Sequence, residues 1–428
     1  MRLARAACVA FIVGAGLAVA WIAWQNLRGD AHFADSASSI AVDTALVERG
    51  AYLARAGNCA ACHTARGGAE YAGGRGIATP FGTVYAGNLT PDLASGLGGW
   101  SAGDFWRAMH NGRSRDGRLL YPAFPYPNLT QVTRADSDAI FAFLRTRPAI
   151  AALNRPHELR FPYGRQWALA VWRALYFRAE TFVPQPQESA QWNRGAYLVR
   201  GLGHCDACHS PRNALGASSD KRELAGGLIP VQNWYAPALA AGPGDDRAAR
   251  RVEQLATWLK TGTSAEGSAQ GPMAEVVFRS TQHLDQADLR AMATFIVSLP
   301  ADESARGASA ATKAAPPEPE PAVMARGAEV YRNRCADCHG SQGQGAAGAY
   351  PPLAGNRRIM RASAANVLRV IVDGGFAPAT GGNPRPYGMP PFGQALSDAD
   401  LAAVATYVRN AWGNRAPPVS ELVAMRLR

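Results

Sequence analysis

The feature that most constrains this chain is a five-residue pattern that occurs three times. Two cysteines separated by two residues are followed directly by a histidine: Cys59, Cys62 and His63; Cys205, Cys208 and His209; Cys335, Cys338 and His339. Two thiols one helical turn apart suit thioether attachment of a c-type haem, and the adjacent imidazole suits ligation of its iron. We therefore predict three covalently bound haem c groups with these histidines as axial ligands.

Two other types of site use paired cysteines, namely zinc knuckles and dithiol redox centres. A zinc knuckle needs two pairs to meet, and three pairs do not divide into fours. The motifs contain six of the seven cysteines, which leaves only Cys8. No structural disulfide is therefore expected, and the haems would brace the fold instead.

Length and charge set broad limits on the protein. A chain of 428 residues is typical of about three domains, the same number as the motifs. The formal net charge is +11, but no basic stripe with interleaved aromatic residues is present. Haem propionates would remove roughly six of these charges. We expect no nucleic-acid partner, and a modestly basic surface that suits acidic proteins or anionic lipid.

The N-terminus indicates export. Arg2 and Arg5 precede an apolar run over residues 6–24. This run is longer than the roughly 7–15 residues of a secretory signal and approaches the roughly 20 residues of a membrane span. We favour an uncleaved anchor over a cleaved signal. Both place the rest of the chain on the periplasmic side of a bacterial cytoplasmic membrane, where c-type haem is attached.

Each haem motif lies between two predicted helices. A short helix starts at an Arg-Gly pair and carries Tyr52, Tyr197 or Tyr331. An amphipathic helix closes each unit, at 135–148, 287–300 and 399–412. Asp136, Asp288 and Asp400 stand at the start of the closing helices, where a carboxylate suits free N–H groups. Phe143, Phe295 and Tyr407 share one helical position, which predicts close packing of an aromatic side chain on the glycine of the opening helix.

This plan resembles the class I cytochrome c fold. The resemblance implies an all-α protein with three tandem cytochrome c domains after an N-terminal anchor or signal. Domain boundaries follow from changes in composition, with a Trp-rich helix expected at 167–177, packed between domains or on the membrane surface. The predicted segments are an anchor and tether at 1–42, domains at 43–155, 188–302 and 324–414, linkers at 156–187 and 303–323, and a tail at 415–428.

A low-spin electron carrier needs a second axial ligand, which in cytochromes c is usually a methionine sulfur. Met389 lies in a proline-stiffened loop before the third closing helix, and we prefer it to Met360. Met273 stands in the equivalent place in the second unit. Met292 lies within the closing helix and is expected in the core.

The first unit departs from this pattern. Its loop reads YPAFPYPN at 121–128, with Phe124 where a methionine is expected. Phenylalanine cannot bind iron. Met109 is the preferred tentative ligand, with His110 and an open iron as the alternatives. The competing interpretation of Met109 is a core residue on one face of its helix.

Longer stretches resemble the three-haem cytochrome c subunits of membrane-bound periplasmic dehydrogenases. They are FGTVYAGNLTPD at 81–92, YPAFPYPNLT at 121–130, RGAYLVRGLGHCDACHSPRNALGA at 194–217 and residues 271–300. The resemblance implies a catalytic dehydrogenase partner that oxidises an alcohol, aldehyde or N-heterocycle. AFPY at 123–126 favours a molybdopterin and 2Fe–2S partner, whereas STQHLDQADL at 280–289 favours a quinoprotein. Both branches remain open.

We therefore predict an electron-transfer subunit that passes electrons to ubiquinone or a terminal oxidase. No catalytic Ser/His/Asp set, phosphate-binding loop or molybdopterin site is evident, and no catalytic residue is assigned. Two alternatives remain: a peroxidase-like haem enzyme with an open first iron, and a cytochrome c subunit of a terminal oxidase.

Overall fold

The computed structural model describes residues 2–28, 43–219, 222–239, 248–265, 267–300 and 316–428. The chain forms two compact units. The first contains Met1–Gln187, Tyr197–His204 and Asn213–Ala217, and the second contains the remaining segments. Residues 29–42 of the predicted anchor and tether, and residues 303–315 of the predicted linker at 303–323, lie outside the described residues.

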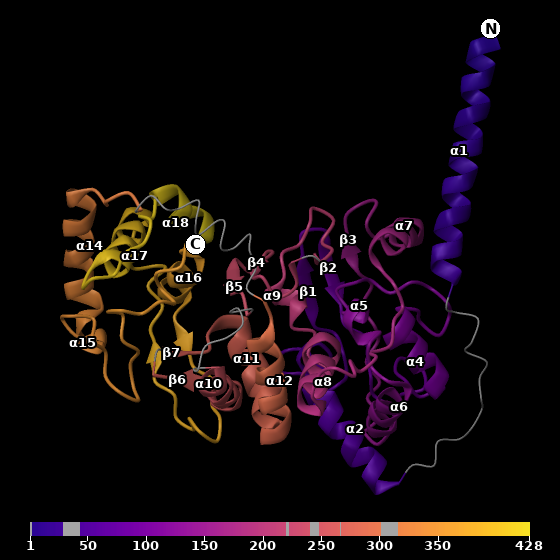
Figure 1. Ribbon diagram of the computed structural model, residues 1–428, viewed down its shortest axis with the longest axis horizontal. Helices are drawn as coiled ribbons and strands as arrows, with labels where there is room; N and C mark the ends of the chain where they lie inside the picture. The colour runs from indigo at the N-terminus through magenta and orange to yellow at the C-terminus, as the bar shows by residue number, and fades with distance from the viewer. Residues whose placement is uncertain (1, 29–42, 220–221, 240–247, 266, 301–315) are drawn as a thin grey trace. The chain divides into compact units, whose positions relative to one another are not determined.

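The first unit begins with α1 (Arg2–Leu27), which is long and apolar enough to cross a membrane (Figure 1). The other elements of this unit are α2 (Thr44–Ala56), α3 (Cys59–Cys62), β1 (Gly76–Thr79), β2 (Gly82–Tyr85), α4 (Ala102–Asn111), α5 (Tyr126–Leu129), α6 (Arg134–Arg145), β3 (Glu158–Leu159), α7 (Gln166–Tyr176) and the π-helix η1 (Tyr197–Leu202). Within the unit, α6 packs on both α2 and α4.

The second unit contains two further helical groups, one around α12 (Gln286–Ser298) and one around α17 (Asp398–Asn410). α12 packs on α8 (Ala190–Ala196) and α10 (Ala248–Thr261), and α17 packs on α14 (Pro321–Arg334) and α18 (Glu421–Leu427). Its helices are α8 (Ala190–Ala196), α9 (Asp206–His209), α10 (Ala248–Thr261), α11 (Gly271–Arg279), the 3-10 helix η3 (Thr281–His283), α12 (Gln286–Ser298), α14 (Pro321–Arg334), α15 (Ala336–His339), α16 (Ala365–Asp373), α17 (Asp398–Asn410) and α18 (Glu421–Leu427). Its strands are β4 (Gly227–Ile229), β5 (Trp234–Ala236), β6 (Thr263–Ser264), β7 (Gly267–Ser268), β8 (Gly375–Phe376) and β9 (Gly388–Met389).

Short strands join the helices, so the fold is helix-rich and not purely α-helical. All of them pair antiparallel, and the longest ladder runs from Gly76 opposite Tyr85 to Thr79 opposite Gly82. β3 adds to the edge of β2 and completes a three-stranded sheet. Strands of two to four residues carry little apolar alternation, which is why the residue pattern predicts helices alone.

The opening helices start four to five residues before the predicted Arg-Gly pairs. Thr44, Ala190 and Pro321 are their first residues. The closing helices lie where the sequence places them, although they end two or three residues earlier. Their N-caps are Thr133, Asp285 and Ser397, so the three recurring aspartates stand three residues inside the cap.

The predicted packing of an aromatic residue on a glycine is confirmed three times. A Cβ added to Gly50 would lie 2.8 Å from Cβ of Phe143, and Gly195 has the same relation to Phe295 at 2.9 Å. In the third group Gly327 would meet Cβ of Tyr407 at 2.6 Å. The backbone carbonyl four residues before each aromatic residue is closer still. A side chain larger than hydrogen would push the opening and closing helices apart.

Candidate haem-attachment and electron-transfer sites

The three cysteine pairs have a common local geometry. The first cysteine of each pair is half-buried and the second is exposed, and no disulfide joins any of the seven cysteines. Each pair lies on or beside a four-residue helix: α3, α9 or α15. Burial raises the pKa of Cys59 and Cys205 to about 12, and that of Cys335 to about 11. One turn of helix thus presents two thiols per motif.

The histidine of each motif has one ring nitrogen fixed by a backbone carbonyl. Nδ1 of His63 lies 2.7 Å from the Gly87 oxygen, and Nδ1 of His209 lies 2.7 Å from the Pro237 oxygen. A carbonyl can only accept, so Nδ1 carries the proton in both rings. Nδ1 of His339 makes the same bond at 3.1 Å, to the oxygen of Pro351.

This tautomer leaves Nε2 of each ring with a free lone pair, as an iron ligand requires. Burial also lowers the pKa of His63, His209 and His339, which favours the neutral imidazole. Among the described residues, no three His, Cys, Asp or Glu side chains converge as a zinc site would need. The paired thiols and the oriented imidazoles fit covalent haem c.

The predicted methionine ligands occupy different environments. Met389 lies on β9, opposite Gly375, and packs against the buried cluster around Leu401. The sulfur of its rival Met360 instead faces the backbone N–H of Arg415 at 3.4 Å. Met389 therefore remains the better candidate for the third haem.

Met273 is half-buried, near the start of α11. Met292 is 4% exposed within α12, which confirms the prediction that it belongs to the core. The assignment of Met273 as a ligand stays a prediction.

The first unit places Met109 on α4 with its sulfur 3.7 Å from the hydroxyl of Ser137. The neighbouring His110 stacks on Trp106, and its Nδ1 lies 2.7 Å from the Thr130 carbonyl. Phe124 is half-buried and stands two residues before the buried Tyr126. Met109 and His110 both stay candidate ligands. Each already makes a polar contact, Met109 with Ser137 and His110 with Thr130.

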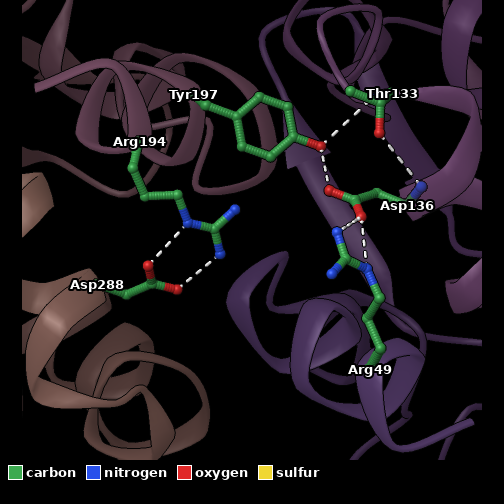
Figure 2. A network of polar contacts seen from close by, with 6 residues as sticks. All are labelled: Arg49, Thr133, Asp136, Arg194, Tyr197 and Asp288. Carbon is green, nitrogen blue, oxygen red and sulfur yellow. Dashed lines mark hydrogen bonds and ion pairs between the residues drawn. The ribbon is translucent and has the colours of Figure 1, made fainter. Parts of the chain in front are cut away.

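Three Arg–Asp ion pairs join the opening helices to the closing helices. Nε and one terminal nitrogen of Arg194 each lie 2.7 Å from an oxygen of Asp288 (Figure 2). Arg49 pairs with Asp136 and Arg326 with Asp400, through Nε at 2.9 and 2.8 Å. Sequence reasoning missed these pairs, although the arginine and the aspartate recur together in all three repeats.

Comparisons with known proteins identify the family of this chain. The cytochrome c family model matches residues 47–148 and 324–412. The cytochrome c subunit of alcohol dehydrogenase (quinone) from Gluconacetobacter polyoxogenes is 36% identical over 395 residues, which cover 88% of this chain and 82% of that one. The gluconate 2-dehydrogenase cytochrome c subunit of Pantoea cypripedii is 35% identical over 405 residues, with 91% and 90% covered. This chain belongs to the dehydrogenase cytochrome c subunits.

A further relative of this cytochrome c subunit is one of the subunits of nicotinate dehydrogenase from Pseudomonas putida. It is 42% identical over 372 residues, which cover 86% of this chain but only 30% of that protein. As a dehydrogenase cytochrome c subunit, the chain binds haem c covalently and transfers electrons for a catalytic dehydrogenase partner. A peroxidase-like enzyme and a terminal-oxidase subunit are not favoured.

Proposed function

We propose that this subunit carries three haem c groups in three cytochrome c domains, at 43–155, 188–302 and 324–414. The observation that carries the proposal is the carbonyl-held histidine, which occurs at all three cysteine pairs. The haem-holding residues are three cysteine pairs, three histidines and three methionines: Cys59, Cys62, Cys205, Cys208, Cys335, Cys338, His63, His209, His339, Met273, Met389 and Met109.

The protein residues determine how these groups work. Haem supplies reversible one-electron chemistry at iron when bound. The carbonyls of Gly87, Pro237 and Pro351 hold the proton on Nδ1 and orient each ring. A methionine sulfur as the second ligand raises the reduction potential. The chain moves electrons and needs no general acid or base of its own.

The electron donor is a periplasmic dehydrogenase of either the molybdopterin/2Fe–2S or the quinoprotein type. The test is to purify the full chain with its co-expressed catalytic subunit and to add ethanol, gluconate or nicotinate anaerobically. Reduction of the haem bands by one of these substrates, and only in the presence of the catalytic subunit, supports the proposal. Turnover of hydrogen peroxide by the isolated chain, without substrate-driven reduction in the complex, would contradict it.

We propose ubiquinone as the electron acceptor, with a terminal oxidase as the alternative. A cavity of about 340 Å³ in the first unit supports this choice. Nδ1 of His157 accepts the N–H of Tyr85 at 3.2 Å, so the proton of the neutral ring is on Nε2. We propose that Nε2 donates this proton to a quinone carbonyl. Tyr121, Phe161 and Gln166 also line this cavity. His157→Ala should slow reduction of a water-soluble ubiquinone but leave reduction of ferricyanide unchanged; equal rates for both acceptors would remove this cavity as the quinone site.

We also propose that α1 is retained as a membrane anchor. Asn26, at the foot of α1, is 8% exposed and donates a 2.9 Å hydrogen bond to the Ala170 carbonyl on α7. Its side-chain oxygen accepts from Nε of the buried Arg173 at 3.1 Å, and its backbone carbonyl accepts from Arg113. A helix that is cleaved off during export has no need for these contacts.

N-terminal sequencing of the mature protein tests this anchor. A mature N-terminus that contains α1, together with recovery in the membrane fraction, is the expected result. A mature chain that begins after Leu27 would contradict it. Leu27→Ala is the matched control for Asn26→Ala, because Leu27 is 63% exposed. Asn26→Ala should loosen α7 in hydrogen exchange, whereas the control should not.

A further inference from the structure

The second repeat contains one residue more than the first between its arginine and its histidine. Residues 49–63 read RGAYLARAGNCAACH, and residues 194–209 read RGAYLVRGLGHCDACH, so the lengths are 15 and 16. The structure takes up the extra residue in η1 (Tyr197–Leu202), a π-helical turn. The N–H of Gly203 bonds to the Leu198 carbonyl, five residues back, at 2.7 Å. Such π-bulges are rare and are frequent at functional sites.

This turn packs into the first unit, although its sequence belongs to the second repeat. Leu198 is 1% exposed and Leu202 is fully buried. The phenol of Tyr197 donates a 2.6 Å hydrogen bond to Asp136 and accepts the N–H of Thr133 at 3.2 Å (Figure 2). Asn128 adds a hydrogen bond of 2.9 Å to the carbonyl of Arg200. The ring of Phe182 also lies edge-on to Tyr197. Asp136 therefore accepts hydrogen bonds both from Arg49 of its own repeat and from Tyr197 of the next repeat.

The last residue of this segment extends the contact to the first haem motif. His204 has a φ of +37°, an uncommon conformation for a residue with a side chain. Its imidazole hydrogen-bonds to the backbone of Gly57, which stands two residues before Cys59. A methyl group of Leu202 also lies 3.5 Å from the position of a Cβ on Gly57. His204 directly precedes Cys205, so the polypeptide just before one attachment motif is fixed to the polypeptide just before another.

We propose that Tyr197 and His204 are positioning residues that set the spacing between the first and second haems and therefore the rate of electron transfer between them. This inference rests on the proposed three-haem function. One electron leaves the iron of one haem and reduces the iron of the other, with no proton or bond change. The rate of such a step falls steeply with distance. A segment of eight residues held by four polar contacts limits the range of distances that the two haems sample.

The test uses the full chain with its haems attached. Tyr197→Phe removes only the hydroxyl that reaches Asp136. His204→Ala removes the contact to Gly57, and His204→Gln keeps a donor for it. Tyr331→Phe is the matched control, because the Tyr331 hydroxyl bonds to Gly340 within its own repeat at 2.6 Å. The readouts are the distance distribution between the two ferric haems by pulsed EPR and the rate of electron redistribution after pulse-radiolytic reduction.

We expect Tyr197→Phe and His204→Ala to broaden the distance distribution and to slow the redistribution severalfold. His204→Gln should restore most of the rate, and Tyr331→Phe should leave both readouts unchanged. A wild-type distribution and rate in both Tyr197→Phe and His204→Ala would overturn the proposal. A wild-type chain with fewer than three haems would instead overturn the three-haem function, so the haem content separates the two failures.

Discussion

The hydroxyl of Tyr197 lies 2.6 Å from Oδ2 of Asp136, a residue that belongs to the preceding sequence repeat. The Asp136 side chain is 3% exposed, compared with 9% for Asp288 and 25% for Asp400. The three aspartates have the same helical position and the same kind of arginine partner. Their contributions to stability should therefore differ through burial and through the additional phenol.

Replacement of these aspartates by asparagine should destabilise the closing helices in the order Asp136, Asp288, Asp400. We expect Asp136→Asn to cost about 2–3 kcal/mol, less than the loss of a fully buried ion pair, because Arg49 is exposed. Asp400→Asn should cost on the order of 0.5 kcal/mol. Hydrogen exchange of the amides in α6, α12 and α17 measures each effect locally. Each variant is compared with the unmodified chain. Equal increases of the exchange rate in the three variants would show that burial does not determine how much these ion pairs stabilise the fold.

The glycines of the opening helices should tolerate no side chain. Gly50→Ala, Gly195→Ala and Gly327→Ala each place a Cβ against the backbone of the closing helix, which cannot rotate away. We expect each to destabilise its own helix pair by about 2–3 kcal/mol, as overpacking does. Differential scanning calorimetry and haem incorporation are the measurements.

Gly381→Ala is the control for this series. Among the residues that the structure describes, no atom lies within 4 Å of the Cβ that it would add. Its melting curve should match that of the unmodified chain. A melting curve for Gly327→Ala that matches the curve of Gly381→Ala would contradict the close packing of α14 on α17 at Gly327.

Acid should weaken the pair of Arg326 and Asp400. Hydrogen bonds from Ser397, followed by the Arg326 guanidinium, lower the pKa of Asp400. A lowered folded-state pKa stabilises the fold above the unfolded value of about 3.9, and this contribution is lost as the pH falls through the folded value. The stability difference between the unmodified chain and Asp400→Asn should therefore be constant near neutral pH and shrink in acid. Thermal unfolding followed from pH 7 downward checks this, and a difference that grows in acid has the wrong sign.

Replacement of a ligating methionine should lower the potential of one haem and leave the others unchanged. Met389→Ala and Met273→Ala each remove a methionine that we propose as an axial ligand. A methionine sulfur raises the reduction potential of a haem in cytochromes c, so its loss should lower that potential. A spectroelectrochemical titration should show one of the three redox steps shifted downward. Met109→Ala should act on the first haem alone. Met360→Ala is the control, because its sulfur faces the Arg415 N–H; a shifted potential in that variant would reassign the ligand of the third haem.

The sequence predicted the features that depend on residue type and period. Residues that recur at the same positions of the three repeats predict the cysteine pairs, the closing helices and the contact between Gly195 and Phe295. The acceptors of the histidine protons do not, because Gly87, Pro237 and Pro351 contribute backbone carbonyls that any residue has. The quality of these hydrogen bonds depends on where the loop passes, and the sequence does not encode that locally.

The hydrogen bond between Tyr197 and Asp136 likewise could not be predicted from the sequence. In the sequence it resembles Tyr52, two residues after the same glycine. The one signal was the extra residue between Arg194 and His209, which a comparison of the repeat lengths reveals. We grouped Tyr331 with Tyr52 and Tyr197 as the tyrosine of an opening helix. Tyr331 stands four residues after its glycine, and its hydroxyl bonds within its own repeat, so it is not equivalent to Tyr197.

The most direct test of the account is the number of haems bound covalently per chain. Intact-mass measurement of the denatured, full-length protein should show three haem additions, and Cys-to-Ala changes at both cysteines of one motif should remove one addition each. The three motifs are to be removed one at a time: Cys59 with Cys62, Cys205 with Cys208, and Cys335 with Cys338. A mass with two haem additions in the unmodified chain, or a motif whose removal leaves the count unchanged, would contradict the three-haem electron-transfer subunit.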